Sequence, residues 1–292
     1  MGESVLNDAP MENVAPDAVA VETVVTPPLG LIPLRSVKSF ERLYLAPSVK
    51  ANIDAFIEEQ ESREALELAG LKPRHKLLMN GPPGNGKTAL AGALAVALGI
   101  DAYLVSYDQI ISGKVGETSA NLNAVFEFAE RRGSTMLFFD EFDAIGRERG
   151  DDQETGEMKR VTSTLLTQLD RVPSHVICVG ATNHAGMLDG AIWRRFNLRL
   201  ELPMPHLDLF EPFMHEMFDN FRRKAKGSIR MGDIDLDLSI VAYRLGFENF
   251  SDCELFCTNC YRAFVLAKGE SGIDDVIKAC ADAWASGQQR AN

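Results

Sequence analysis

One eight-residue segment has the composition of a phosphate-binding loop. It reads Gly-Pro-Pro-Gly-Asn-Gly-Lys-Thr over residues 81–88, directly after an apolar run and directly before the helix-forming segment 89–98. Glycines let backbone N–H groups curl around a phosphate, and the N-terminus of the following helix adds partial positive charge. Lys87 can reach the β- and γ-phosphate oxygens, and the Thr88 hydroxyl can ligate Mg²⁺. The segment therefore predicts binding of a Mg-bound nucleoside triphosphate. The predicted nucleotide-binding residues are Gly81, Pro82, Pro83, Gly84, Asn85, Gly86, Lys87, Thr88 and Ala89.

Two acidic residues, Asp140 and Glu141, end the apolar run 136–139 abruptly. If this run is a buried strand, both carboxylates lie at the carboxyl edge of the sheet, where such folds hold their ligands. Asp140 would then hold Mg²⁺ together with Thr88, and Glu141 would orient or deprotonate the attacking water. Without a phosphate loop the pair could simply end a strand in solvent, but with the loop present a catalytic role is favoured. Asp143 is left open, because it could also cap the helix that follows.

The elements that must position these residues alternate along the chain. Short apolar runs are separated by helix-length segments, which predicts crossover connections and a mainly parallel sheet. The predicted strands are 76–79, 102–105, 135–139, 175–179 and 198–202, and a helical pattern over 49–68 precedes them. After Pro203 and Pro205 only helical patterns remain, at 207–224, 235–245, 251–268 and 272–287. The sequence thus predicts a P-loop α/β domain, a parallel sheet flanked by helices, followed by a small all-helical domain.

Composition divides the 292 residues into three parts. Residues 1–34 contain five acidic residues and no Lys or Arg, which predicts a flexible acidic tail. Residues 35–204 form the expected α/β domain, and residues 205–292 form the expected helical domain.

Charge and hydropathy exclude several classes of protein. The formal net charge of −12 disfavours a broad nucleic-acid-binding surface, which needs clustered Lys and Arg. The longest apolar stretch, 89–100, is far shorter than the roughly 20 residues that span a bilayer, and the first residues lack a signal-peptide pattern. Five cysteines without such a signal fit a reducing compartment. A cytoplasmic protein without a membrane segment is expected.

A second motif resembles a motif of a known protein family. Residues 180–184, Gly-Ala-Thr-Asn-His, and residues 188–196, Leu-Asp-Gly-Ala-Ile-Trp-Arg-Arg-Phe, follow the loop and the acidic pair in the order found in the AAA family of ATPases. The chain resembles this family from about Leu43 to at least Leu266. The resemblance implies ATP as the nucleotide, Mg²⁺ as the metal ion, and a helical lid as the second domain.

The resemblance also assigns roles to polar residues of the second motif. In the family, the asparagine at the position of Asn183 contacts the γ-phosphate or the attacking water. Arginines at the positions of Arg194 and Arg195 reach into the neighbouring subunit's site, which implies a homo-oligomer and, by family habit, a ring of six. Two adjacent arginines could instead form salt bridges on the surface of one chain.

A third segment, 111–118, resembles the loop that lines the central pore of such rings. Lys114 stands where the family usually places an aromatic residue that grips a polypeptide. An ammonium group lacks that apolar grip, so Lys114 disfavours threading and suits an acidic partner segment. The alternative is an ordinary solvated loop residue.

The segments 112–129, 140–161 and 182–196 are similar to compact bacterial AAA ATPases that are often encoded beside a subtilisin-like serine protease. The sequence therefore predicts Mg-dependent ATP hydrolysis coupled to remodelling or regulation of a protein partner, which could be such a protease. One alternative is a nucleotide-dependent switch subunit of a protease or toxin system. An ATPase acting on DNA is less favoured because of the acidic balance.

Overall fold

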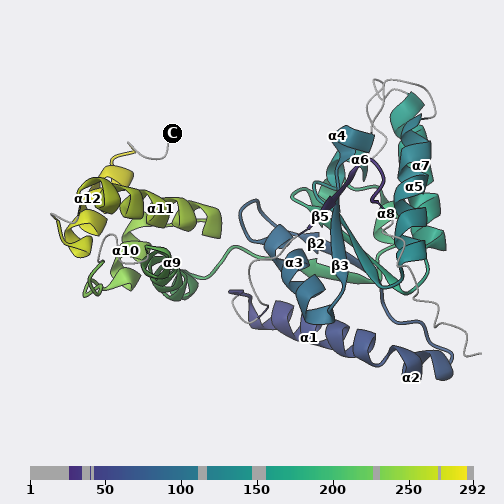
Figure 1. Cartoon of the computed structure of the whole chain (residues 1–292), viewed down its shortest axis with the longest axis horizontal. Coiled ribbons are helices and arrows are strands. Elements are labelled where there is room, and N and C mark those ends of the chain that lie inside the picture. The colour runs from purple at the N-terminus through teal and green to yellow at the C-terminus, as the bar shows by residue number, and fades with distance from the viewer. Residues whose placement is uncertain are drawn as a thin grey trace, which may run out of the picture.

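The computed structural model describes residues 26–34, 40, 43–110, 117–146, 156–225, 231–268 and 271–287. Two bodies are visible in Figure 1, an α/β body on the right and a helical body on the left, joined by the segment after strand β6. This arrangement confirms the predicted fold class, a mainly parallel sheet flanked by helices and followed by a helical region.

The α/β body is built on a sheet with the strand order β1-β3-β4-β5-β2-β6. Strand β1 pairs with β3 in the antiparallel direction, whereas the other neighbouring strands are parallel. All five residues of β4 and all seven of β5 are buried, as expected for central strands covered on both faces. The strands are β1 Leu31–Pro33, β2 Lys76–Asn80, β3 Asp101–Val105, β4 Thr135–Phe139, β5 Val176–Thr182 and β6 Leu198–Glu201.

Helices cover both faces of this sheet. On one face, α1 and α3 bury apolar side chains such as Phe56 and Leu94 against the strands. On the other face, α5 and α7 lie side by side and contribute Phe126 and Leu165 to a second apolar cluster. The helices of this body are α1 Pro47–Glu61, α2 Arg63–Leu68, α3 Lys87–Leu98, α4 Tyr107–Ile110, α5 Glu117–Arg132, α6 Asp143–Gly146, α7 Gly156–Arg171 and α8 Gly190–Trp193, with a 3₁₀ turn at Ala185–Met187.

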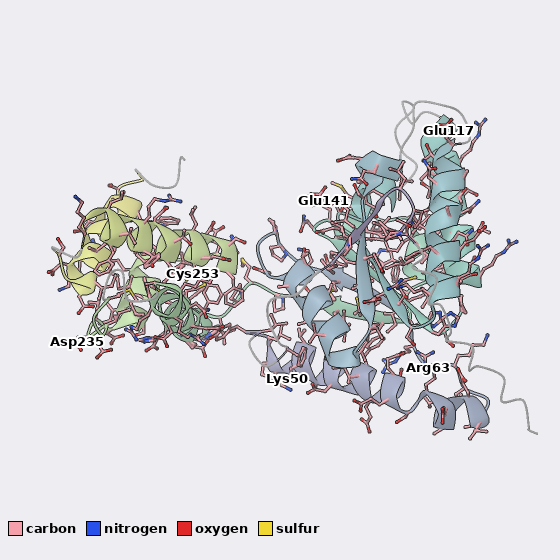
Figure 2. The ribbon with its side chains drawn as sticks, viewed as in Figure 1. Lys50, Arg63, Glu117, Glu141, Asp235 and Cys253 are labelled. Atoms are coloured by element: carbon pink, nitrogen blue, oxygen red, sulfur yellow. The ribbon has the colours of Figure 1, made fainter. Side chains whose placement is uncertain are left out.

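The helical body has an apolar core of its own. A 3₁₀ turn at Leu207–Leu209 leads into α9 Phe210–Lys224, which is followed by α10 Leu238–Leu245, α11 Phe250–Leu266 and α12 Ile273–Ala285. Phe247, Phe256 and Trp284 pack edge-to-face or tilted in its centre. The thiol of Cys253, labelled in Figure 2, lies in this core, and the other three cysteines of the body are buried there too.

Three details differ from the sequence-based expectation. Residues 31–33 form β1 and pair with β3, so the predicted tail of residues 1–34 was too long at its C-terminal end. The apolar pair Leu31–Ile32 is the signal that the acidic composition concealed, and Leu31 packs into the core. Strand β5 continues to Thr182, into the second motif, and the helix expected over 49–68 is interrupted at Ser62.

Candidate functional site

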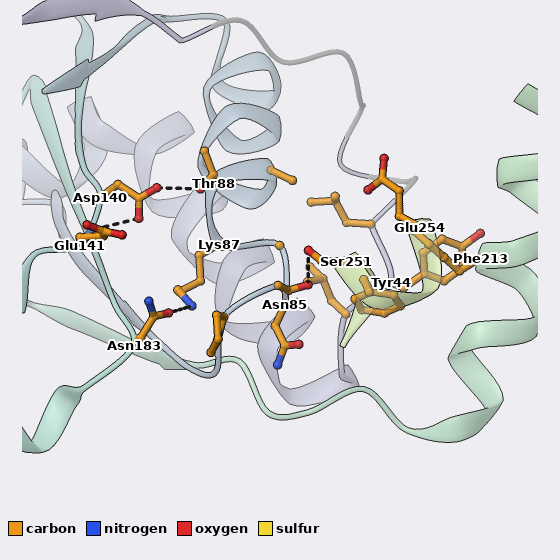
Figure 3. A pocket seen from close by; sticks show the side chains of 17 residues that line it. Tyr44, Asn85, Lys87, Thr88, Asp140, Glu141, Asn183, Phe213, Ser251 and Glu254 are labelled. Carbon is orange, nitrogen blue, oxygen red and sulfur yellow. Dashed lines mark hydrogen bonds between the residues drawn. The ribbon is translucent and has the colours of Figure 1, made fainter. Parts of the chain in front are cut away.

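The phosphate-binding loop connects β2 to α3, as the sequence predicted (Figure 3). Its last glycine, Gly86, has a φ of 83° and serves as the N-cap of α3. This left-handed conformation strains residues with a Cβ but suits glycine. It turns the chain so that the helix begins directly at Lys87, with its N-terminal N–H groups facing the loop.

Lys87 is buried at the centre of the loop. Its ammonium donates hydrogen bonds to the carbonyl oxygens of Gly81 and Pro82, at 2.7 and 2.9 Å, and to Asn183 Oδ1 at 2.6 Å. Burial lowers the pKa of Lys87, while the negative charges of Asp140 and Asp143 act in the opposite direction. A bound phosphate would supply a further anion and favour the charged ammonium.

Thr88 and Asp140 present oxygen atoms to the same place. The Thr88 hydroxyl donates to Asp140 Oδ2 at 3.0 Å, and the other carboxylate oxygen accepts the backbone N–H of Glu141 at 2.9 Å. Hydroxyl and carboxylate oxygens are ligands that Mg²⁺ accepts, and this ion is commonly held by one or two protein groups with water and phosphates completing its shell. The two residues therefore fit a magnesium ion that arrives with a nucleotide.

Glu141 follows in an unusual backbone conformation. Its φ is 48°, in the left-handed region that residues with a side chain seldom adopt. Such strain tends to gather at functional sites, where the surrounding structure enforces it. The next amide, of Phe142, donates to the Ala181 carbonyl at 2.7 Å and thereby ties the turn to β5. The side chain of Glu141 is exposed and lines a cavity beside the phosphate-binding loop, where it can act on a water molecule.

Asn183 is held at the end of β5 by a buried polar pair. The Thr182 hydroxyl donates to Asp143 Oδ1 at 2.8 Å and accepts the N–H of His184 at 3.0 Å. Residues on both sides of Asn183 are thus fixed while its amide faces Lys87. For Asp143, the open question is answered by geometry: it begins α6 and its carboxylate braces the Asn183 turn.

The two arginines of the second motif have different surroundings. Arg195 donates to the carbonyl oxygens of Leu166 and Ala191 and to Asp170 Oδ2, the last at 2.8 Å. Arg194 is exposed, and its guanidinium makes no hydrogen bond or ion pair with the described part of the chain. Neither arginine lines the nucleotide cavity of its own chain.

Comparison with known proteins identifies the α/β body. The sequence model of the family described as "ATPase family associated with various cellular activities (AAA)" matches residues 77–204. The chain carries an AAA ATPase domain. The matched range contains the loop, the acidic pair, Asn183 and both arginines.

Relatives of this chain come from bacteria and eukaryotes. An uncharacterized AAA family ATPase y4kL of Sinorhizobium fredii is 36% identical over 211 residues, which are 72% of this chain and 60% of that protein. Peroxisomal ATPase pex6 of Schizosaccharomyces pombe is 40% identical over 130 residues, 43% of this chain and 14% of that protein. Cell division control protein 48 homolog C of Arabidopsis thaliana is 33% identical over 203 residues, 63% of this chain and 25% of that protein. The chain thus spans less than two thirds of the length of these relatives.

The cavity of the AAA domain is closed on one side by the helical body. It has a volume of about 420 Å³, and Phe213, Phe250 and Glu254 of the helical body line it opposite the phosphate-binding loop. Tyr44, from the segment before α1, completes this side and lies edge-to-face against Phe213, with ring centroids 5.6 Å apart (Figure 3).

Sequence reasoning missed these lining residues. Tyr44 belongs to no motif, and it lies beside the cavity because the helical body packs against the AAA domain. Its hydroxyl donates to the Pro212 carbonyl and lies 3.0 Å from Glu216 Oε2, and burial, followed by the contact with Glu216, raises its pKa to about 12. Tyr44 therefore connects the segment before α1 to α9 while one face of its ring borders the cavity.

Backbone contacts also join the loop to the helical body. The carbonyl oxygen of Gly84 accepts the N–H of Ser251, at the start of α11, at 3.3 Å. Asn85 is buried and donates to the Pro203 carbonyl at 2.9 Å, in the segment that connects the two bodies. Of the predicted nucleotide-binding residues, 83–89 line the cavity, whereas Gly81 and Pro82 contribute carbonyl oxygens to Lys87.

Two further expectations concern the pore loop and the membrane. Lys114 lies outside the described residues. Among the helices that are described, none combines the length and the apolar character needed to cross a membrane.

Proposed function

We propose that this protein is a Mg-dependent ATPase whose nucleotide cycle remodels or regulates a protein partner. The observation that carries the proposal is the convergence of Lys87, Thr88, Asp140, Glu141 and Asn183 on one cavity that the helical body closes. Polar groups of three kinds meet there: the Lys87 ammonium, which can bind phosphates, the oxygen atoms of Thr88 and Asp140, which can bind a metal ion, and the exposed carboxylate of Glu141, which can bind a water molecule.

Each of these groups has a place in phosphoryl transfer. The N-terminus of α3 and the Lys87 ammonium bind the β- and γ-phosphates, and Thr88 and Asp140 hold Mg²⁺, which neutralises phosphate charge when bound. Glu141 orients the attacking water and accepts its proton, because its exposed carboxylate can form a hydrogen bond to that water. Asn183, which lies next to Lys87, would position the γ-phosphate or the water.

The cavity wall opposite the loop fits the adenosine part of ATP. Phe213, Phe250 and Tyr44 offer apolar and aromatic surface, and Glu254 adds a polar group at the rim. Small-molecule sites typically combine such apolar walls with a few polar contacts. Since these residues come from both bodies, binding and release of the nucleotide would change how the helical lid sits against the AAA domain.

The assembly and the partner belong to the same proposal. Arg194 is exposed and has no contact with its own cavity, which supports a role at the site of a neighbouring subunit in a homo-oligomer, with six subunits as the family habit. The partner is a protein in the cytoplasm, and the resemblance to ATPases encoded beside subtilisin-like proteases makes such a protease the first partner to test. The predicted domain 35–204, extended at its N-terminal end to include β1, and the predicted domain 205–292 are proposed as the two parts that move relative to each other.

Replacement of Glu141 by Gln tests the proposal. The change keeps the shape of the side chain but removes the base, so ATP binding is expected to persist while turnover falls by about 10²-fold or more. Fluorescent-nucleotide titration and phosphate release measure the two quantities. Glu127→Gln is the matched control, because Glu127 is exposed on α5 and paired only at 3.4 Å with Arg131. Turnover of Glu141→Gln within a factor of about two of the unchanged protein would contradict the assigned role.

A further inference from the structure

A second hollow lies away from the nucleotide cavity, between α5 and α7. It has a volume of about 440 Å³ and shares no lining residue with the nucleotide cavity. Its α7 side presents Arg160, Ser163, Thr167 and Arg171, and Asn123 faces them from α5. Among the described residues that line it, none is acidic or apolar. We call this hollow the α5–α7 groove.

The floor of the groove is neutral and internally hydrogen-bonded. Thr164 donates to the Ser119 hydroxyl at 3.2 Å, and Gln168 Nε2 donates to Asn123 Oδ1 at 2.6 Å. These pairs hold the two helices together and leave hydroxyl and amide groups at the surface. Such groups can bond to the backbone of an extended peptide.

The two arginines at the ends of the groove are the unusual feature. Both side chains are exposed, and neither guanidinium makes a hydrogen bond or ion pair with any residue in the described ranges. Other arginines of this acidic chain do find carboxylates, such as Arg132 with Asp101 at 2.7 Å and Arg244 with Asp282 at 2.8 Å. Arg160 and Arg171 therefore provide two cations for an anionic ligand, and no acidic residue stands beside them among the described lining residues of the groove.

The spacing of these cations matches the spacing of carboxylates in residues 1–25. Arg160 and Arg171 are eleven positions apart on one helix face, which corresponds to about 16 Å along the axis. Residues 1–25, the acidic segment, carry no Lys or Arg, and their carboxylates are four or five positions apart, at Glu3, Asp8, Glu12, Asp17 and Glu22. Successive side chains of an extended chain point to opposite sides, so the pair that is four positions apart, Asp8 and Glu12, faces one side at a spacing of about 13 Å. The long arginine side chains can bridge the remaining difference of about 3 Å.

The acidic segment also joins the AAA domain close to the groove. It leads through residues 26–30 into β1, and Gly30 lies against the Ile110 side chain. The carbonyl oxygen of Ile110 accepts the Asn121 amide of α5 at 3.1 Å, and Asn123, two positions further along α5, lines the groove. Twenty-five residues can extend over about 80 Å, so the attachment point leaves ample reach.

We propose that the acidic segment of this chain binds in its own α5–α7 groove as an extended peptide. Asp8 and Glu12, which lie four positions apart and therefore on the same side of an extended chain, pair with Arg160 and Arg171, and the neutral floor bonds to the intervening backbone. Helix α7 also supplies Leu166 and Asp170, which hold Arg195 beside Arg194. The bound segment thus lies against the helix that holds Arg195. Its contact with the α5–α7 groove does not require ATP hydrolysis.

A distance measurement on the full chain tests this contact. Ala15→Cys in the acidic segment and Ala120→Cys, which is exposed on α5, introduce two labelling sites, while the five native thiols are buried. Nitroxide labels at these sites should give a population of short distances that persists when labelled protein is diluted with an excess of unlabelled protein. Added salt should reduce this population, because the contact is between exposed charges.

Charge reversal supplies the decisive comparison. Arg160→Glu with Arg171→Glu should abolish the short distances, and a further exchange of Asp8→Arg with Glu12→Arg should restore them. The matched control reverses Arg223 and Arg262, which bond only within their own helices of the lid, and should leave the distances unchanged. The proposal is overturned if the unchanged groove gives no short distances, if dilution removes them, or if groove reversal leaves them as they were.

Discussion

At the scale of single residues, Arg194 and Arg195 show how adjacent identical side chains acquire different roles. Arg195 uses its guanidinium within its own chain, on two carbonyl oxygens and on Asp170. Arg194 keeps its guanidinium exposed. The sequence motif assigns both residues to the neighbouring site, whereas the geometry gives one of them a structural task as well.

Alanine replacements should separate the two tasks. In the proposed assembly, Arg194→Ala removes a charge that stabilises the transition state in the neighbouring site, so turnover should fall by about 10³-fold with little change in the unfolding midpoint. Arg195→Ala removes several charge-assisted hydrogen bonds and should also lower the free energy of unfolding by about 2 kcal/mol. Steady-state phosphate release and urea unfolding give the two readouts. Equal losses of stability in both variants would contradict the distinction.

The positions of the site residues were predictable because they depend on neighbours in sequence. Lys87 and Thr88 belong to one loop, and Asp140 and Glu141 end one strand, so strand–loop–helix patterns place them at one edge of the sheet. Tyr44 could not be found in this way. Its place depends on the contact between two separately folded bodies, and no local pattern encodes that contact.

At the scale of elements, the loop and the lid meet at Gly84. Its φ is 76°, and a Cβ built there would lie 2.6 Å from Asn249 Oδ1 and 3.0 Å from Ser251 Oγ. Asn249 is the N-cap of α11, where its side chain accepts the N–H of Asp252. The loop can therefore approach the lid helix closely only because residue 84 has no side chain.

Gly84→Ala and Gly86→Ala form a matched pair for this contact. Both glycines have a left-handed φ, so alanine should cost about 1–2 kcal/mol of stability at either position. Only Gly84 has atoms of the lid within 4 Å of the added methyl group, so that variant should lose about 1–3 kcal/mol more. Thermal unfolding without nucleotide measures the difference. Equal losses would show that the lid can shift aside without cost.

The strands differ in how clearly the sequence predicts them. The strands 135–139 and 176–182 are buried on both faces, so they read as continuous apolar runs. Strand β1 has only three residues and is held by pairing with β3 at the edge of the sheet. So short a strand gains its stability from the neighbour rather than from its own pattern, and acidic residues upstream hid it.

At the scale of the whole molecule, the proposed function makes a complete catalytic site depend on a second chain. The described residues that line the cavity include Lys87, Asp140 and Glu141 but no arginine, so the proposal assigns the arginine that reaches the phosphates to a neighbouring subunit. An arginine supplied across an interface makes turnover depend on assembly. The rate of phosphate release per subunit should therefore increase as the protein concentration increases.

Mixing two inactive variants tests this dependence directly. Lys87→Ala lacks the phosphate-binding cation but keeps Arg194, whereas Arg194→Ala keeps an intact loop. If the subunits exchange at random in an equimolar mixture, about a quarter of the interfaces combine an intact loop with an intact arginine, and phosphate release should return to that extent. The control mixes Lys87→Ala with Glu141→Gln, since these changes lie on the same side of the interface and no pairing restores a site. Failure of the first mixture to exceed this control, after exchange has been verified by native mass spectrometry, would mean that each chain works with its own groups alone.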